Sequence, residues 1–242
     1  MIKNFFEKQM LVDGFNEDSL KKLSNSKVLI IGCGGVGHPA IIYLLSTGIG
    51  NLYIADDDLV DFNNLHRQFI FDQNDIGKSK VEIIKSKLAG KYPHSNIVSI
   101  NKRIDEKYLF EIIDDIDVVI DASDNFETRY LVNDICVEKQ VPLVSGSCIN
   151  QEGQIISFKN NDSGPCYECL FPRKKNLLDQ NCESEGVIPT VAGSVGTFSS
   201  MQAISIILGD EECFNKLILI NMKAGKIAQS FLSENPGCII CS

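Results

Sequence analysis

The chain contains no apolar run long enough to cross a lipid bilayer. Its longest apolar runs lie near residues 40–45 and 204–208, whereas a membrane-spanning helix needs about 20 such residues. The N-terminus mixes charged and apolar residues and lacks the pattern of a signal peptide. The sequence therefore predicts a cytoplasmic protein that does not act at a membrane.

Basic residues are scarce as well. The 23 Lys and Arg residues are outnumbered by 32 Asp and Glu residues, which gives a net charge of −9. An acidic surface disfavours nucleic acid as a partner. There is no linker rich in Pro, Gly or Ser, no internal repeat and no low-complexity tract. With 242 residues, 44% of them hydrophobic, the chain is suited to a single α/β domain over residues 1–242.

What the sequence does contain is a nucleotide-binding pattern. A β-branched apolar run enters the glycine-rich turn Gly32-x-Gly34-Gly35-x-Gly37, and Asp56 ends the next apolar run 19 residues after Gly37. The glycines allow a tight turn and a close approach of phosphate to a helix N-terminus. An acidic side chain at this distance can take both ribose hydroxyls. The combination indicates a nucleotide site.

Strand and helix patterns alternate through a nucleotide-binding half, residues 1–149, and change in a second half, residues 150–242. Alternation of this kind predicts a Rossmann-like, doubly wound, mostly parallel sheet, with ligands at the carboxyl ends of the strands. The second half predicts an antiparallel extension that ends in a hairpin. The expected strands are 27–31, 51–55, 96–100, 118–122, 142–147, 154–158, 216–222 and 227–231, and the expected helices are 16–24, 35–46, 79–89, 107–113, 127–139 and 191–208.

A charged segment follows the second expected strand, at the point where a dehydrogenase would enter a helix. It contains Asp58, Asn64, Arg67 and Gln68, and Lys80 follows 13 residues after Arg67. The planar fork of Arg67 and the point charge of Lys80 are suited to clamp the β- and γ-phosphates of a triphosphate. The alternative is a solvated charged loop.

A second acidic cluster ends the fourth expected strand and so lies beside the same crevice. It reads Asp121-Ala122-Ser123-Asp124-Asn125. A carboxylate here can hold Mg²⁺ against phosphate oxygens. The alternatives are that Asp121 is an ordinary residue at a strand end and that Asp124 is a helix N-cap.

Four cysteines form two Cys-x-x-Cys pairs, separated by 68 residues. Four thiolates in two such pairs are the ligand set of a closed tetrahedral zinc site, which contributes to folding rather than to catalysis. A redox pair is the alternative. The four residues are Cys166, Cys169, Cys238 and Cys241.

The other cysteines and the histidines predict less. Cys182 lies in a polar segment, where a lone thiol is a candidate nucleophile, with an idle surface thiol as the alternative. The spacing of the three histidines suggests no triad with it. Four further cysteines in or near apolar runs are expected to be buried fillers, namely Cys33, Cys136, Cys148 and Cys213.

Together these motifs resemble the ThiF/MoeB/HesA family, the bacterial relatives of ubiquitin-activating enzymes. The resemblance runs from about Phe5 to Cys241, and the segments around Asp56 and Cys182 look most like the thiamine-pathway ThiF branch. It implies that Asp124 faces Mg²⁺ and that Cys182 takes part in sulfur transfer. The residues implied to bind Mg·ATP are Gly35, Asp56, Asn64, Arg67, Lys80 and Asp124, with the other glycines, Asp58, Gln68 and Asn125 beside them.

The resemblance also implies a reaction and its partners. The C-terminal glycine of a small β-grasp sulfur carrier, ThiS-like and ending in Gly-Gly, is adenylylated by ATP, and pyrophosphate leaves. A sulfur donor such as a desulfurase then supplies the thiocarboxylate sulfur. The family implies a homodimer in which an arginine reaches the neighbouring subunit's ATP; this chain has Lys8 there, which keeps the charge but not the bidentate fork.

Other readings stay open from the sequence. A MoaD-type carrier, another ubiquitin-like protein or a peptide would use the same chemistry. An NAD-dependent dehydrogenase would explain Asp56 but not Arg67, Lys80 or Asp124. A non-catalytic nucleotide-binding scaffold would bind the carrier without turnover.

Overall fold

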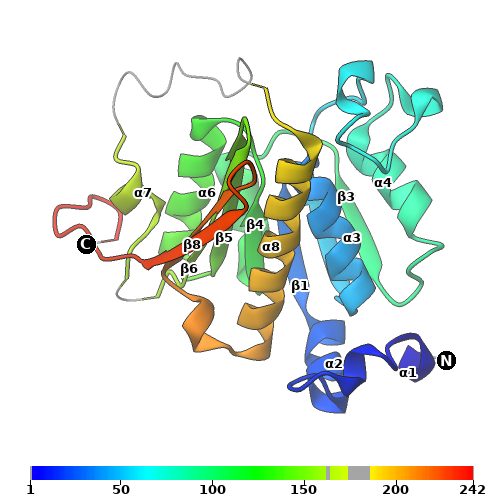
Figure 1. The fold of residues 1–242 in the computed structure, drawn as a ribbon, viewed down its shortest axis with the longest axis horizontal. Helices are drawn as coiled ribbons and strands as arrows, with labels where there is room; N and C mark the ends of the chain where they lie inside the picture. Colours follow the sequence, from blue (N-terminus) through cyan, green and yellow to red (C-terminus); the bar gives the residue numbers. More distant parts are fainter. Residues whose placement is uncertain (1, 162–163, 174–185, 242) are drawn as a thin grey trace.

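Strands from both halves of the sequence join in a single sheet (Figure 1). The computed structural model describes residues 2–161, 164–173 and 186–241, and within them the sheet has eight strands in the order β3-β2-β1-β4-β5-β6-β7-β8. The strands are β1 (Lys27–Ile31), β2 (Asn51–Ala55), β3 (Asn96–Ile100), β4 (Val118–Asp121), β5 (Leu143–Ile149), β6 (Glu152–Phe158), β7 (Lys216–Asn221) and β8 (Lys226–Phe231).

The sheet is parallel from β3 to β5 and antiparallel from β5 to β8. β1 lies between β2 and β4, so the strand order reverses direction at β1 and β4. Ile31 at the end of β1 is in register with Asp121 at the end of β4. In open α/β sheets, ligands bind outside the carboxyl ends of the strands at such a switch point. The fold therefore places the glycine-rich turn and the second acidic cluster side by side.

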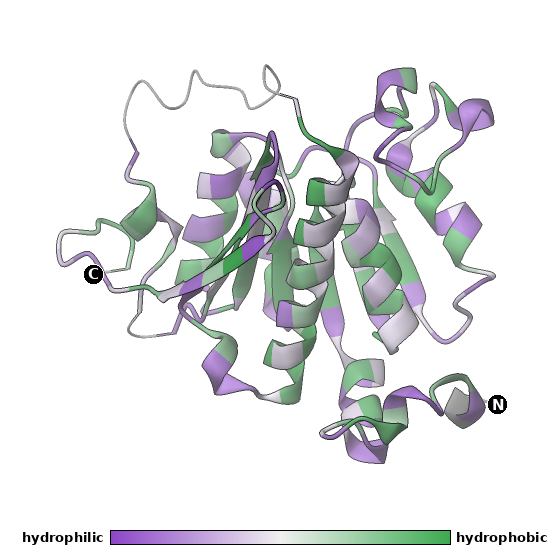
Figure 2. Cartoon of the chain, in the orientation of Figure 1, coloured by the Kyte–Doolittle hydropathy of each residue, from purple (hydrophilic) through white to green (hydrophobic). Residues whose placement is uncertain are grey.

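Helices cover both faces of the sheet, because the central strands are apolar on both sides. In β1, Val28 and Ile30 enter one core, with α3, α4 and α8, whereas Leu29 and Ile31 enter the other, with α5 and α6. Figure 2 shows the central strands mainly in the colour of hydrophobic residues. The helices are α1 (Ile2–Phe5), α2 (Glu17–Asn25), α3 (Gly37–Thr47), α4 (Lys80–Leu88), α5 (Glu106–Ile112), α6 (Phe126–Glu138), α7 (Tyr167–Leu170) and α8 (Pro189–Leu208).

The expected elements agree with these bounds to within two residues. The side chain of Asn16 caps α2 by accepting from the N–H groups of Asp18 and Ser19. α3 ends at Gly48, which has a φ of +104° and donates to the last carbonyls of the helix. Five short 3₁₀ turns are also described: η1 (Gln9–Leu11), η2 (Phe62–Asn64), η3 (Gln73–Asp75), η4 (Ile113–Asp115) and η6 (Glu211–Cys213).

α8 needs a correction to the expectation that no segment could cross a membrane. By length and composition this helix is long and apolar enough to do so. It packs instead against α3 and the strands β4, β5 and β6. A Cβ at Gly196 would stand 2.1 Å from the carbonyl oxygen of Val36, so α8 touches the beginning of α3 closely. Its apolar residues belong to the hydrophobic core that covers one face of the sheet.

Candidate nucleotide and metal sites

Two glycines of the turn are required by close backbone contacts. Gly32 has a φ of +94°, and a Cβ there would stand 2.6 Å from the carbonyl oxygen of Ala122, just after β4. A Cβ at Gly37 would stand 2.2 Å from the carbonyl oxygen of Gly32. A side chain at Gly32 would push the turn away from the end of β4, and one at Gly37 would clash with the turn itself. These contacts hold the N-terminus of α3 at the switch point of the sheet.

The other two glycines lie under the side chains of Arg67 and Gln68. A Cβ at Gly35 would stand 3.3 Å from Cγ and Cδ of Arg67, and one at Gly34 would stand 4.0 Å from Nε2 of Gln68. Gln68 is buried, and its Oε1 has no hydrogen-bond partner among the described residues. A buried amide oxygen without a partner is suited to accept a hydrogen bond from a ligand. The turn thus has a cationic and a polar side chain above it.

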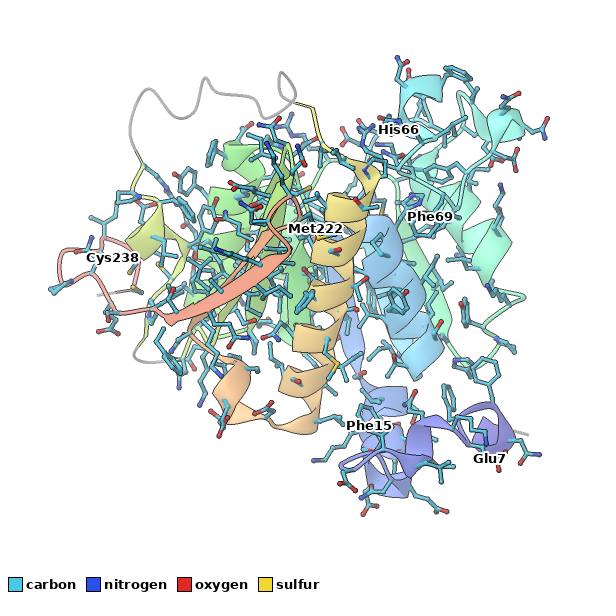
Figure 3. The ribbon with its side chains drawn as sticks, viewed as in Figure 1. Glu7, Phe15, His66, Phe69, Met222 and Cys238 are labelled. Atoms are coloured by element: carbon cyan, nitrogen blue, oxygen red, sulfur yellow. The ribbon has the colours of Figure 1, made fainter. Side chains whose placement is uncertain are left out.

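The segment that carries Arg67 and Gln68 is held as a tight turn. The N–H groups of both residues donate to the carbonyl of Asn64, each at 3.0 Å, and Phe71 N–H donates to the carbonyl of Gln68 at 3.1 Å. Figure 3 labels His66 and Phe69, which flank the pair in this loop. The backbone carbonyl of Asn64 thus fixes the positions of Arg67 and Gln68. Binding of Mg·ATP by Asn64 stays a prediction.

Asp56, Asp58 and Lys80 form a charged group beside the turn. Asp56 accepts from the N–H of Cys33 at 2.6 Å and from that of Asp58 at 2.9 Å. Nζ of Lys80 lies 2.6 Å from Asp58 Oδ2 and 3.9 Å from Asp56 Oδ1. Burial raises the pKa of Asp56, although the charge of Lys80 opposes this. Each carboxylate oxygen of Asp56 keeps a further lone pair, with which it can accept a hydrogen bond from a ribose hydroxyl. Binding of ribose by Asp56 stays a prediction.

The side chain of Lys80 is 4% exposed, yet it keeps its charge. Burial alone would lower the pKa of Lys80, but the nearby carboxylates of Asp56 and Asp58 overcome this and raise it. A buried ammonium at the N-terminus of α4, beside the glycine-rich turn, is available for phosphate. Contact with the β- and γ-phosphates remains a prediction for Lys80 and Arg67.

The residues of the second acidic cluster have different roles: some support the fold, and Asp124 is exposed. Asp121 is buried, and its Oδ1 accepts from the N–H and hydroxyl of Ser123 at 3.0 and 2.6 Å. The side chain of Asn125, not that of Asp124, caps α6 by accepting from Thr128 N–H at 2.9 Å. The alternative role of Asp124 as an N-cap was therefore wrong. Asp124 is exposed at the carboxyl end of β4, where a carboxylate can take Mg²⁺.

Lys8 does not lie with these residues. The neighbouring Gln9 donates from Nε2 to the carbonyl of Thr47 at 3.0 Å, which places this segment at the C-terminal end of α3. The glycine-rich turn lies at the other end of α3, about 16 Å away for a helix of 11 residues. Lys8 therefore cannot touch a nucleotide at the turn of its own chain. Cys182 lies outside the described residues.

The paired cysteines converge on one point at the edge of the fold, near the labelled Cys238 in Figure 3. Sγ of Cys166 lies 3.7 Å from Sγ of Cys238, and Sγ of Cys169 lies 3.3 Å from Sγ of Cys241. All four sulfur atoms lie within 4.8 Å of one another. In a tetrahedral zinc site with Zn–S bonds of about 2.3 Å, the sulfur atoms are about 3.8 Å apart. The four thiols thus fit Zn²⁺.

This cluster is attached to the nucleotide-binding half through α6. Asn133 on α6 accepts from the N–H of Tyr167 at 2.7 Å, and Tyr130 donates to the carbonyl of Phe171 at 2.9 Å.

Of the cysteines expected to be buried fillers, Cys148 is only half-buried, so that expectation was wrong for this residue. It holds for Cys33, Cys136 and Cys213.

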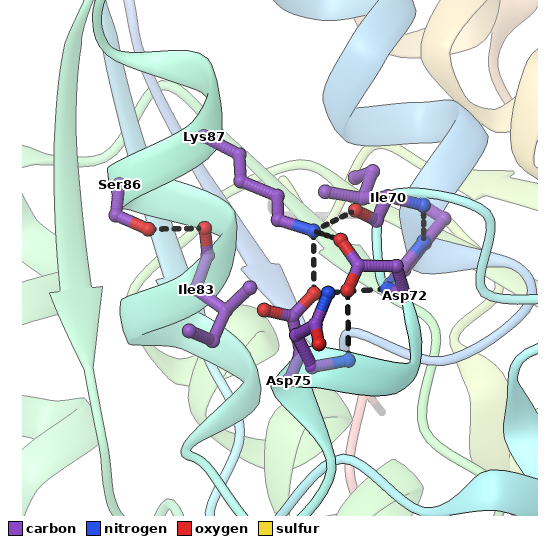
Figure 4. Close-up of polar contacts among 8 residues, drawn as sticks. Ile70, Asp72, Asp75, Ile83, Ser86 and Lys87 are labelled. Atoms are coloured by element: carbon purple, nitrogen blue, oxygen red, sulfur yellow. Dashed lines mark hydrogen bonds and ion pairs between the residues drawn. The ribbon is translucent and has the colours of Figure 1, made fainter.

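Three polar residues near the site were missed in the sequence. Arg129 on α6 is buried and donates to Ser145, to the carbonyl of Gly146 and to that of Ser123. His38, at the start of α3, accepts from the N–H of Ile70. Lys87 on α4 donates to the carbonyl of the same residue (Figure 4). No local pattern in the sequence signals the burial of Arg129, because α6 also carries acidic residues. The contacts of His38 and Lys87 with Ile70 have no local pattern either.

Comparison with known proteins identifies relatives over the whole chain. The molybdopterin-synthase adenylyltransferase of Escherichia coli is 35% identical over 98% of this chain and 95% of its own. The sulfur carrier protein ThiS adenylyltransferase of the same organism is 34% identical over 98% and 94%. The SAMP-activating enzyme E1 of Haloferax volcanii is 33% identical over 98% and 87%. These sequence identities are too similar to assign the chain to one branch of relatives, so membership of the thiamine branch stays a prediction.

Other relatives are longer. The adenylyltransferase and sulfurtransferase UBA4 of Meyerozyma guilliermondii is 40% identical over 206 residues, but the chain spans only 48% of its length. Among solved structures, E. coli MccB with ATP superposes with a TM-score of 0.80 at 26% identity, over 93% of this chain and 68% of that one. The profile of the ThiF family matches residues 6–239. The expected family is thereby confirmed: the chain belongs to the ThiF family of E1-like adenylyltransferases.

Proposed function

We propose that the protein uses ATP to adenylylate the C-terminal carboxylate of a small ubiquitin-like sulfur carrier of the ThiS type. The observation that carries this proposal is the convergence of Arg67, Gln68 and the buried ammonium of Lys80 on a glycine-rich turn at the switch point of the sheet. A dehydrogenase has no use for two cations at this place. Three relatives that the chain matches over most of their length support the proposed class of reaction: they are named as adenylyltransferases of the sulfur carrier protein ThiS and of molybdopterin synthase, and as a SAMP-activating enzyme.

The chain's own residues have electrostatic and positioning roles in this reaction. Bound Mg·ATP supplies the α-phosphorus and the pyrophosphate leaving group. The carrier's carboxylate is already ionised at neutral pH, so its attack needs no general base. Arg67 and Lys80 neutralise phosphate charge, and Asp124 offers a metal-facing carboxylate. In agreement, burial and the charge of Lys80 lower the pKa of His38, at the start of α3, to about 3, so this imidazole is a weak base.

The proposal includes partners and later steps. The protein is proposed to act in the cytoplasm as a homodimer, with Lys8 of each protomer directed to its partner's nucleotide. After adenylylation, the thiolate of Cys182, or a persulfide delivered by a desulfurase, attacks the carrier's carboxyl carbon, and AMP leaves with the oxygen to which it was bonded. The cysteine cluster holds zinc in a structural role.

Carrier-dependent exchange of labelled pyrophosphate into ATP tests the proposal. Purified protein is incubated with Mg·ATP and, separately, with a ThiS-type carrier, a MoaD-type carrier or a short peptide. Exchange with the ThiS-type carrier alone is expected, and the same carrier without its last glycine is the control. Exchange only with the MoaD-type carrier or the peptide would overturn the choice of substrate. Absence of exchange with every substrate, or turnover of NADH, would overturn the function.

A further inference from the structure

Ile70 is held from both sides by two helices of the nucleotide site. Its N–H donates to Nδ1 of His38 on α3 at 3.3 Å, and its carbonyl accepts from Nζ of Lys87 on α4 at 3.1 Å. Ile70 lies three residues after Arg67 in the same tight turn. α3 begins at the glycine-rich turn, and α4 begins at Lys80. The two contacts therefore tie the Arg67 segment to both elements with which it must act.

The ammonium of Lys87 is fully used in this arrangement (Figure 4). Besides the carbonyl of Ile70, it donates to Asp72 at 2.6 Å and to Asp75. An ammonium has three N–H donors, so each one has a partner within this loop. Asp72 and Asp75 also cap each other's turn, since Asp75 accepts from the N–H of Asp72. An ordinary surface ion pair would not organise a loop in this way.

His38 is built to accept rather than to donate at Nδ1. Its ring is buried, with the rings of Phe69 and Phe71 at 5.7 and 4.6 Å in edge-on contact. Burial, and then the charge of Lys80, lower the pKa of this imidazole to about 3, so the ring is neutral at neutral pH. Because Nδ1 accepts from the N–H of Ile70, the single ring proton is assigned to Nε2. The contact with Ile70 N–H is therefore maintained across the physiological range.

Lys80 and Lys87 lie on one face of α4. They are seven residues apart, which is close to two helical turns and a rise of about 10 Å. Lys80 points to the glycine-rich turn, and Lys87 secures the loop that covers that turn. A displacement of about 1 Å in such a loop can cost up to about 100-fold in rate.

We propose that His38 and Lys87 form a clamp on Ile70, the Ile70 clamp, which positions Arg67 and Gln68 over the glycine-rich turn for the nucleotide. Both are positioning residues, because they act through the loop and touch no phosphate themselves. The kinetic test of this inference rests on the proposed function, because it uses carrier-dependent exchange. A second test measures nucleotide binding alone and needs no carrier.

The binding test compares Lys87→Met with Lys85→Met. Lys85 is exposed on the same helix and is the matched control. The dissociation constant of a non-hydrolysable ATP analogue with Mg²⁺ is measured by calorimetry, which needs no carrier. We expect Lys87→Met to weaken binding by about tenfold and Lys85→Met by less than about twofold. Equal affinities of Lys87→Met and the wild type would overturn the clamp.

A double-mutant cycle separates positioning from a merely structural effect. If Lys87 acts through Arg67, then Lys87→Met should weaken analogue binding by less than about twofold in an Arg67→Gln background. A tenfold loss in both backgrounds would overturn the proposal. In the exchange assay, the KM for ATP should rise in Lys87→Met while the KM for the carrier stays within about twofold. No exchange by the wild type would reject the proposed function but leave the binding test in force.

Conservative replacement of His38 gives a second, independent test. Oδ1 of asparagine can take the place of imidazole Nδ1 as an acceptor, whereas leucine offers no acceptor. We expect His38→Asn to bind the analogue within about threefold of the wild type and His38→Leu to bind at least about tenfold more weakly. Thermal unfolding of each variant identifies the folded fraction. Equal binding by the two variants, both folded, would overturn the role of His38.

Discussion

The guanidinium of Arg129 lies 3.5 Å from the carboxylate of Asp121, and both side chains are buried beneath the loop that carries Asp124. The same guanidinium donates to Ser145 and to the backbone carbonyls of Ser123 and Gly146. Through these contacts, α6 fixes the ends of β4 and β5 in relation to each other. The exposed carboxylate of Asp124 is thus carried by a rigid base.

Removal of Arg129 is therefore expected to destabilise the fold strongly. Arg129→Gln leaves the carboxylate of Asp121 buried without its charged partner, which costs about 3–5 kcal/mol. Urea unfolding measures the change in free energy. The matched control is Arg103→Gln, because the pair of Arg103 with Glu127 is exposed and should cost about 1 kcal/mol or less. Similar losses in the two variants would contradict this account of Arg129.

Zinc is expected at one ion per chain, bound by the four clustered cysteines. The cluster joins the α7 region to the C-terminal segment, so removal of the metal should free that end of the chain. Elemental analysis gives the stoichiometry, and thermal unfolding with and without a chelator gives the stability. Cys238→Ser should abolish zinc binding, whereas Cys148→Ser, outside the cluster, should retain it. A purified protein without zinc would refute the assignment.

The sequence predicted the central sheet well because its strands are buried on both faces. Runs such as Lys27–Ile31 are short, apolar and β-branched, and the glycine-rich turn follows directly from local chemistry. The choice between Asp124 and Asn125 as the cap of α6 could not be made, since adjacent Asp and Asn residues have equal capping preference.

Sequence patterns could not predict the Ile70 clamp, for a different reason. Its groups come from α3, α4 and an irregular loop, and hydrogen bonds between distant segments have no period. Asp72 and Asp75 read as ordinary solvated acids until Lys87 is placed between them. The buried Arg129 was missed similarly, because its partners lie on β4 and β5. Packing, rather than propensity, decides these positions.

Stability is expected to fall between pH 7 and pH 5 because of His38. The pKa of this imidazole is about 3 in the folded protein, as a result of burial and the charge of Lys80, against 6.5 for the free side chain. Between these values the unfolded chain binds a proton that the folded chain does not, so stability decreases as pH falls below 6.5. At pH 5 the loss amounts to about 2 kcal/mol. Urea unfolding of the wild type and of His38→Asn should differ by this amount in their pH dependence; equal slopes would contradict it.

Asp124→Ala is expected to abolish carrier-dependent pyrophosphate exchange while the fold is retained. The side chain is exposed, so its removal should change the free energy of unfolding by less than about 0.5 kcal/mol. Loss of a metal-facing carboxylate removes charge stabilisation of several kcal/mol from the transition state. Exchange kinetics and urea unfolding check the two parts. Exchange at the wild-type rate would reject the role of Asp124.

Cys182→Ser is expected to separate the two proposed steps. Adenylylation uses only the carrier's own carboxylate, so pyrophosphate exchange should persist in this variant. Sulfur transfer needs a thiolate or its persulfide, so a covalent adduct with the carrier should be lost. Intact mass with and without reductant detects the adduct. An adduct that persists in Cys182→Ser would assign the sulfur chemistry to another thiol.

Complementation between inactive variants tests whether Lys8 acts across a dimer. Lys8 lies at the far end of α3 from the glycine-rich turn of its own chain, so any contact with nucleotide must come from a partner. In a heterodimer of Lys8→Ala and Asp124→Ala, one site then has both native residues and the other has neither. With random subunit exchange at equal amounts, a symmetric dimer should regain about a quarter of the wild-type exchange rate. If each site used its own Lys8, every site in the mixture would lack one residue, and mixing would restore no activity.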